Sequence, residues 1–196
     1  MPYNYYICNV KLENFDLSHL PVYLLNEDQL SAYSVYMANQ GNRPDLFPTD
    51  QFPNASQRED YLDYDVPPEA LEDEVFAAML NEAEKYLGMP YVWGGSSPST
   101  SFDCSGFVSW VINHSGWNVG RLGAQGLCNI CTPVSSANAR PGDLIFFKGT
   151  YDTPGVSHVG IYVGNGMMIH CGSPISYASI NTSYWQQHFY TFGRLP

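Results

Sequence analysis

The sequence is poor in basic side chains. Its 196 residues hold 8 Lys and Arg against 19 Asp and Glu, which gives a formal net charge of −11. Because nucleic-acid backbones carry dense negative charge, this balance argues against nucleic acid as a partner. It also argues against tight electrostatic binding to anionic lipid or to anionic wall polymers. We interpret the acid excess as a contribution to solubility.

The sequence also lacks a continuous apolar run long enough to span a bilayer. Its first residues do not follow the basic, apolar and small-residue order of a secretory signal. Taken alone, these absences predict a cytoplasmic protein. The strand-like opening at residues 3–10, however, looks more like a domain junction than a natural start. We therefore expect a piece of a larger exported protein, extracellular or associated with the cell wall, with no membrane insertion by this chain.

Cysteine is sparse, with five residues at positions 8, 104, 128, 131 and 171. An odd, scattered set does not form a disulfide framework. Only Cys128 and Cys131 have a Cys-x-x-Cys spacing, and no second close pair of ligands accompanies them to complete a structural zinc site. We interpret this pair as small buried residues, with a local disulfide or redox pair as the alternative. No metal or other cofactor is expected.

The chain is rich in apolar and aromatic residues. It is 44% hydrophobic, with 15 Tyr and 10 Phe, which is typical of a globular protein with a buried core. The first 64 residues differ in composition from the rest: an alternating segment, a short predicted helix around residues 27–38, and a turn-rich run over residues 41–64. We interpret residues 1–64 as an extension or linker of unknown role, and residues 65–196 as the domain that carries the chemistry.

Helical periodicity comes first in this domain. Pro67 and Pro68, followed by acidic residues and an apolar stripe, predict a helix that ends near Gly88. A second helix is predicted from Cys104 to near Gly116. Strands are then predicted over residues 143–147, 157–163, 167–171 and 189–194, with a hairpin turn at residues 164–166. Helices followed by an antiparallel sheet indicate an α+β domain.

Cys104 falls at the predicted start of the second helix. A thiol is a nucleophile only as thiolate, and a helix N-terminus lowers its pKa by offering partial positive charge and free N–H groups. The small residues Ser105 and Gly106 leave room for a substrate. A buried structural cysteine is the alternative, but the polar run around Cys104 argues against burial. Cys104 is therefore our candidate nucleophile.

The predicted hairpin supplies a base. Alternation places Val159 and Ile161 on the core face, so His158 points to the other face, beside Gly160. On the partner strand His170 alternates in the same way, and a tight hairpin can bring the two imidazoles together. One can then hold the other in the correct tautomer, as the third member of a triad does. A metal site from both histidines and a cysteine is the weaker alternative, because a fourth ligand and a carboxylate are missing.

Five ordered blocks resemble the NlpC-type cell-wall cysteine peptidases, a bacterial branch of the papain-like fold. The blocks are PYVWGG at 90–95, FDCSGFV at 102–108, RPGDLIFF at 140–147, HVGIYVG at 158–164 and MIH at 168–170. Together they cover residues 65–196. The resemblance implies helices that carry the nucleophile, packed on an antiparallel β-sheet.

The resemblance also implies a role for each matching residue. Cys104 would be the nucleophile, His158 the general base and acid, and His170 the residue that orients His158. Tyr91 matches a tyrosine whose hydroxyl lies near the nucleophile, and Asp103 and Ser105 match positions that hold the free amine of a stem peptide in some members. The Cys104 backbone N–H would help to form the oxyanion hole. Cys171 departs from the small residue common at its position, and alternation predicts that it packs in the core.

The implied function is a peptidoglycan hydrolase whose partners are stem peptides. It would cleave the γ-D-glutamyl–diamino acid bond through a Cys-His-His triad. An N-acetylmuramoyl-L-alanine amidase or an acyltransferase with the same triad remains an alternative. A non-catalytic cell-wall-binding module is a further one, although the intact triad argues against it.

Overall fold

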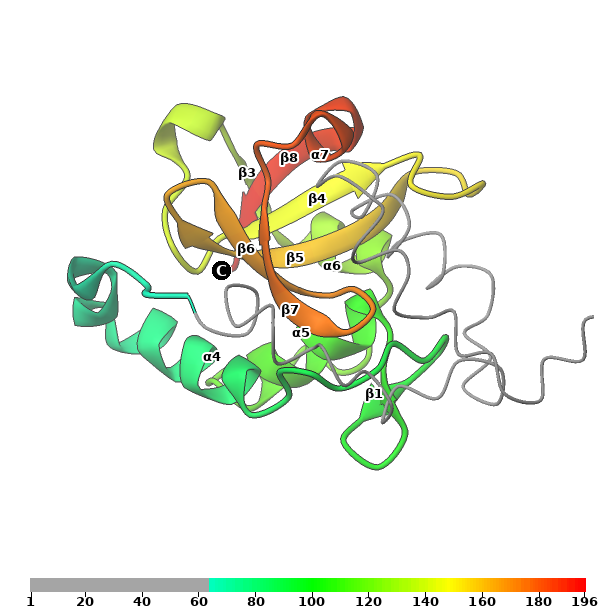
Figure 1. Ribbon diagram of the computed structural model, residues 1–196, viewed down its shortest axis with the longest axis horizontal. Helices are drawn as coiled ribbons and strands as arrows, with labels where there is room; N and C mark the ends of the chain where they lie inside the picture. Colours follow the sequence, from blue (N-terminus) through cyan, green and yellow to red (C-terminus); the bar gives the residue numbers. More distant parts are fainter. Residues whose placement is uncertain (1–63) are drawn as a thin grey trace, which may run out of the picture.

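The computed structural model describes residues 64–196, which form helices and an antiparallel sheet (Figure 1). The α+β class predicted from the sequence is therefore confirmed. The segment predicted at residues 3–10, the helix predicted around residues 27–38 and Cys8 lie outside the described residues. Within residues 64–196, no helix is long and apolar enough to cross a membrane.

The helices lie mostly in the first half of the described chain. They are the 3-10 helices η3 (Pro68–Glu72) and η4 (Ser136–Asn138), and the α-helices α4 (Glu74–Glu84), α5 (Cys104–Asn113), α6 (Ala124–Ile130) and α7 (Ser183–His188). The strands are β1 (Ser96–Ser97), β2 (Ser101–Phe102), β3 (Thr132–Val134), β4 (Leu144–Lys148), β5 (Val156–Gly164), β6 (Met167–Cys171), β7 (Ile175–Ser179) and β8 (Phe189–Arg194).

The first predicted helix is divided in two. Its prolines form the 3-10 turn η3, and α4 begins only after Asp73, whose carboxylate caps two backbone N–H groups of the first turn. Helix α4 ends at Glu84, four residues before the predicted cap Gly88, which has a φ of +80° in the turn that follows. The cap and the apolar stripe thus decide where this helix forms, and the prolines only lead into it.

The main sheet has six antiparallel strands in the order β3-β8-β4-β5-β6-β7. The β5–β6 hairpin turns at Asn165 and Gly166, which have φ of +50° and +72°, as the Gly-Asn-Gly run predicts. The pairing between β5 and β6 begins at the turn with Gly164 and Met167, and its last pair is Ile161 with Ile169. The short strands β3 and β7 and the short helices α6 and α7 were not predicted from the sequence.

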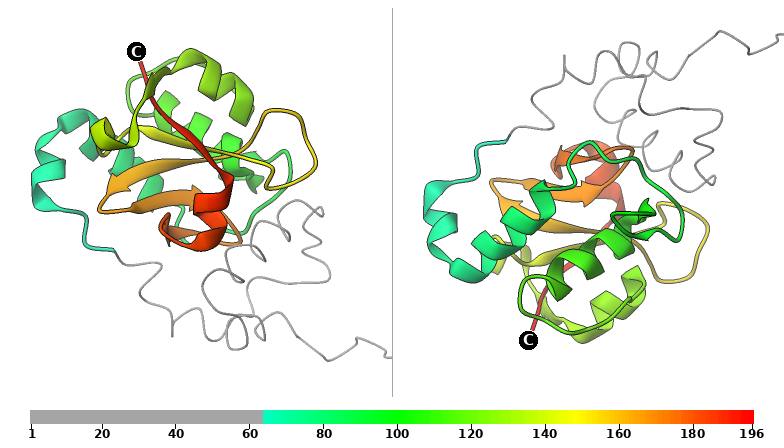
Figure 2. Two further views of the ribbon diagram at one scale, coloured as in Figure 1. Left: turned by 90° about the horizontal axis from the view of Figure 1, so that it is seen from above. Right: turned by 90° about the horizontal axis from the view of Figure 1, so that it is seen from below.

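Both faces of the sheet are covered. Figure 2 shows α5 and α6, in green, on one side of the sheet and α7, in red, on the other. On the α5 side the core holds Phe107, Val108, Val111, Ile112, Leu144, Phe146, Val159, Ile161 and Val163. On the α7 side it holds Ile145, Phe147, Met168, Trp185 and Phe192. This double burial explains why β4 is an uninterrupted apolar run.

Candidate active site

Cys104 is the first residue of α5, as the sequence predicts. Asp103 is the N-cap, and its Oδ1 accepts the Gly106 N–H at 2.6 Å. A Cβ at Gly106 would lie 2.0 Å from the Gly95 carbonyl oxygen, so only glycine lets the 94–95 loop lie against this turn. The local sequence therefore brings the polar loop and the first turn of α5 together around one thiol.

The Cys104 thiol is buried, with 7% of the residue exposed. The pKa of Cys104 is raised to about 12. Burial is the main cause and the Asp103 carboxylate adds to it, while the backbone N–H groups of Val159 and Ser105 and the charge of Arg121 act in the opposite direction. The expectation that the helix N-terminus lowers the pKa of Cys104 overall is therefore wrong, because desolvation of the thiol has the larger effect on it. The thiol is protonated at neutral pH and depends on a base.

His158 and His170 meet across the β5–β6 hairpin, as predicted from strand alternation. The His158 Nε2 and His170 Nδ1 atoms are 2.9 Å apart, and each residue is 3% exposed. Burial lowers the pKa of His158 well below its usual range, with a further contribution from His170, and burial lowers the pKa of His170 to about 4. Both rings are therefore neutral at neutral pH, and the bond between them leaves Nδ1 of His158 for another partner.

The thiol lies against the strand that carries His158. Val159 follows His158 in β5, in the part of the strand that no longer pairs with β6. Its backbone N–H donates to the Cys104 sulfur. Within residues 64–196, no hydrogen bond joins the thiol directly to the His158 ring. The structure thus places the thiol against the backbone of the residue that follows His158, and places His170 against the His158 ring.

Trp185, which was not predicted, packs on both histidines. Its ring is 5.3 Å from the His158 ring at 28° and 5.4 Å from the His170 ring at 85°. The side chain is fully buried, and its Nε1–H is the one buried side-chain polar atom in the described part of the chain that lacks a hydrogen-bond partner. Thr182 caps the short helix α7 through the Trp185 N–H. A helix of six residues gives no periodic signal, so the sequence did not reveal this contact.

Tyr91 is buried next to the nucleophile. It forms an isolated bridge with Phe102, two residues before Cys104. Burial raises the pKa of Tyr91 strongly, and the charges of Cys104 and Asp103 add to the effect, which places the phenol close to both. Its role toward substrate stays a prediction.

Asp103 and Ser105 belong to a network with Arg121, a residue that no motif had indicated. Asp103 Oδ1 accepts the Ser105 hydroxyl at 2.9 Å as well as the Gly106 N–H. Its Oδ2 accepts the Gly94 N–H at 3.1 Å and the Arg121 Nη2 at 2.6 Å. Arg121 Nη1 also donates to the Ser105 oxygen at 3.0 Å. These contacts fix the loop before α5 and the loop before α6 to each other.

An aromatic pair lies beside this network. Trp93 is 52% exposed and packs edge-on against Tyr151, with ring centroids 5.5 Å apart. Burial raises the pKa of Tyr151, and the nearby Cys104 contributes to the rise. Two loops distant in sequence, before α5 and between β4 and β5, therefore meet next to the thiol.

The remaining described cysteines are free thiols. Cys171 is fully buried in the core and donates to the Phe102 carbonyl at 3.2 Å, as its predicted packing role requires. Cys128 and Cys131 are partly buried at the end of α6, so the prediction that they are buried holds only in part. Among residues 64–196, no group of three His, Cys, Asp or Glu side chains could hold a metal ion.

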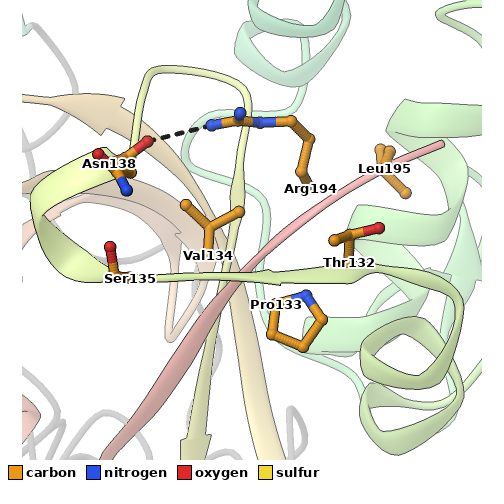
Figure 3. Close-up of a pocket in the computed structure, with 7 residues that line it drawn as sticks. All are labelled: Thr132, Pro133, Val134, Ser135, Asn138, Arg194 and Leu195. Atoms are coloured by element: carbon orange, nitrogen blue, oxygen red, sulfur yellow. Dashed lines mark hydrogen bonds between the residues drawn. The ribbon is translucent and has the colours of Figure 1, made fainter.

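A separate pocket of about 400 Å³ lies at the outer edge of the sheet (Figure 3). It is lined by Thr132, Pro133, Val134, Ser135, Asn138, Arg194 and Leu195. Arg194 donates to the Asn138 carbonyl there and forms a two-point ion pair with the buried Asp143, with both N···O distances 2.8 Å. This arginine therefore ties β8 to the start of β4, and the pocket contains none of the candidate catalytic residues.

Comparison with known proteins matches residues 88–194 to the model of the NlpC/P60 family. The chain is 44% identical over 121 residues to the bifunctional muramidase/DL-endopeptidase CwlT of Bacillus subtilis, a match covering 61% of this chain and 36% of that protein. It is 38% identical over 110 residues to a gamma-DL-glutamyl hydrolase of the same organism, covering 55% of this chain and 26% of that protein.

The structural comparison agrees. A crystal structure of an NLP/P60 family protein from Staphylococcus aureus superposes with a TM-score of 0.61 at 42% identity, covering 63% of this chain and 42% of that one. This chain thus spans about a third or less of the length of these two curated relatives. The family model, however, matches more than half of this chain, and the chain belongs to the NlpC/P60 family.

Proposed function

We propose that this protein is a cysteine endopeptidase that cleaves peptidoglycan stem peptides at the γ-D-glutamyl–diamino acid bond. The observation that carries the proposal is a thiol at the start of α5 that lies against β5, the strand whose His158 is hydrogen-bonded to His170. Family membership and the names of the relatives, a DL-endopeptidase and a gamma-DL-glutamyl hydrolase, support the reaction and the bond.

The reaction begins with a proton transfer. His170 Nδ1 accepts the Nε2–H of neutral His158 and thereby leaves the His158 Nδ1 lone pair for the thiol proton. The resulting thiolate is stabilised by the N–H groups of Val159 and Ser105 and by the imidazolium beside it.

The thiolate then attacks the γ-carbonyl carbon of the D-glutamyl residue. The carbonyl oxygen becomes an oxyanion, and the Cys104 backbone N–H, in the first turn of α5, donates to it because this turn has no intrahelical acceptor for its N–H groups. His158 gives its proton to the departing amine of the diamino acid as the C–N bond breaks. Water, deprotonated by His158, releases the acyl group and restores the thiol.

Peptidoglycan lies outside the cytoplasmic membrane, so the proposal also places the working protein outside the cell or at the wall. The cell-wall relatives support this location. Tyr91, Asp103 and Ser105 remain the proposed substrate-binding residues, and the exposed Trp93 offers an aromatic surface next to them.

The test is to incubate the protein with purified muropeptides and to identify new amines and product masses by mass spectrometry. Cys104→Ala should lower cleavage by about a thousandfold or more, since only binding and oxyanion effects remain. Products cut between muramic acid and L-alanine would instead identify an amidase, and joined peptides an acyltransferase. Equal cleavage by the variant would rule out the thiol mechanism.

A further inference from the structure

Cys128 and Cys131 lie in one turn at the end of α6. The Cys131 N–H donates to the Cys128 carbonyl at 3.3 Å, so the chain between them closes a helical turn. Helix geometry places Cα atoms three residues apart at about 5 Å, within the range of about 4.4–6.8 Å that a disulfide bridges. Cys131 is the C-cap and has an extended backbone, so a small movement of its side chain toward Cys128 does not break the helix.

The two thiols share one partly buried environment. Both side chains pack against the core on the α5 side of the sheet. A Cβ at Gly193 of β8 would lie 2.7 Å from the Cys131 Cβ and 3.5 Å from its Sγ, so Cys131 is held against that strand. The pKa of Cys131 is raised to about 12 by burial, by Cys128 and by Asp143. The effect of Cys128 on Cys131 shows that the two sulfur atoms are close together.

The environment of this pair favours its oxidised form. Burial raises the pKa of Cys128 as well, although Lys148 offsets part of the rise. A disulfide is reduced only when one of its sulfur atoms leaves as a thiolate, and a raised pKa disfavours the thiolate at both positions. A disulfide between these two cysteines should therefore resist reduction.

We propose that Cys128 and Cys131 form a disulfide that braces the junction between the end of α6 and the start of β3. The oxidant is a small-molecule disulfide. The Cys128 thiolate attacks one of its sulfur atoms and displaces a thiolate, and Cys131 then attacks the Cys128 sulfur of the mixed disulfide and displaces the second thiol. The two cysteines lose two electrons and two protons, and the small disulfide becomes two thiols. The inference goes beyond the proposed function and does not depend on it.

The brace acts on a helix that supports the sheet. Leu127 of α6 is fully buried, and the Gln125 Oε1 accepts the Val156 N–H at the start of β5 at 2.9 Å. Cys131 directly precedes Thr132, the first residue of the edge strand β3. A disulfide at this junction should therefore stabilise the folded domain.

The test uses the full chain with Cys104→Ala, so that the candidate nucleophile does not compete for the oxidant. The protein is equilibrated with equal amounts of reduced and oxidised glutathione, free thiols are blocked with iodoacetamide, and the chain is digested with trypsin. Cleavage after Arg121 and Lys148 releases residues 122–148, because the Arg140–Pro141 bond resists trypsin, and this peptide contains both cysteines. We expect it to be unalkylated and two hydrogens lighter than its reduced form. Two alkylated thiols, a lasting glutathione adduct, or pairing with another cysteine would overturn the inference.

Thermal unfolding of the same protein tests the brace. The oxidised form should have a Tm about 5 °C above that of the reduced form, since a bridge across a short loop removes entropy from the unfolded chain. Cys128→Ser and Cys131→Ser should each abolish this difference, whereas the matched control Cys8→Ser should retain it. Equal Tm values for the two forms would overturn the bracing role. A difference that persists in Cys128→Ser would assign the effect to another cysteine and contradict the proposed pair.

Discussion

The candidate nucleophile Cys104 and the candidate base His158 are both buried, but by different kinds of neighbour. Cys104 lies at the start of α5 among hydrogen-bonding and charged groups, with Asp103 and Arg121 beside it. His158 lies on the α7 side among aromatic rings, against Phe147 and Trp185. Burial favours the uncharged form of each group: it raises the thiol pKa and lowers the imidazole pKa.

This comparison indicates how the site works. Hydrogen bonds orient the groups on the α5 side, whereas ring packing orients the imidazoles and keeps water away from them. In the proposed reaction the thiol and the imidazole exchange a proton, so a change to the surroundings of either group should affect the reaction in a distinguishable way.

The largest expected effect is on the imidazole side. His158→Ala removes the base, and we expect kcat/KM to fall by about a thousandfold or more, with the fold unchanged. Muropeptide cleavage measures the loss. The rate of alkylation of Cys104 by iodoacetamide should fall as well, because no neighbour then takes the thiol proton. Retained cleavage would show that another group is the base.

A smaller loss is expected for the orienting histidine. His170→Ala leaves His158 free to rotate, and misplacement of a reacting group costs about a hundredfold in rate. His170→Asn, which can still accept the His158 Nε2–H, should recover much of the activity. If both variants are equally impaired, His170 has a role other than holding the ring.

Substitutions of Trp185 should distinguish its packing on the histidines from a contribution to the stability of the core. Trp185→Phe keeps a ring on His158 and removes the unpartnered Nε1–H, so stability should be retained while kcat falls by about threefold to tenfold. Trp185→Leu removes the ring face and should lower kcat further, with KM little changed. A stability loss equal in both variants, with kcat unaltered, would assign Trp185 to the core alone.

The pH profile tests the electrostatics of burial. His158 must be neutral to act as base, and its pKa is lowered by burial and by His170. Activity should therefore persist as the pH falls below 6.5, and be lost only when the pH passes the lowered value. The profile of kcat/KM against pH, measured on a muropeptide, checks this. Half-loss of activity near pH 6.5 would mean that the imidazole is solvated during turnover.

The smallest expected effect is that of removing a helix cap, and two aspartate caps can be compared. Asp73 caps α4 and Asp103 caps α5. Asp73→Ala should lower the free energy of unfolding by about 1 kcal/mol and leave activity unchanged, because α4 carries none of the candidate catalytic residues. Asp103→Ala should lower both stability and activity. Denaturant unfolding and cleavage rates, measured on both variants, distinguish the two roles. Equal activity in both variants would mean that Asp103 serves only as a helix cap.

Sequence reasoning identified the residues that depend on local pattern or motif. Cys104 follows from a helix start, and the neighbouring His158 and His170 follow from strand alternation across a short hairpin, which the 2.9 Å contact confirms. Arg121 and Trp185 could not be found in this way. Arg121 meets Asp103 across 18 residues of loop and helix, and Trp185 reaches the histidines from a six-residue helix.

The sequence by itself determined the α+β class, the family and the position of the thiol at a helix start, because capping, alternation and turn chemistry act over a few residues. Only the tertiary structure decided the charge states at the site. Desolvation depends on every element packed around a group, and here it outweighs the effect of the helix N-terminus on Cys104. The partners of Asp103 and the ring that covers the histidines were decided in the same way, by segments that meet only when the chain folds.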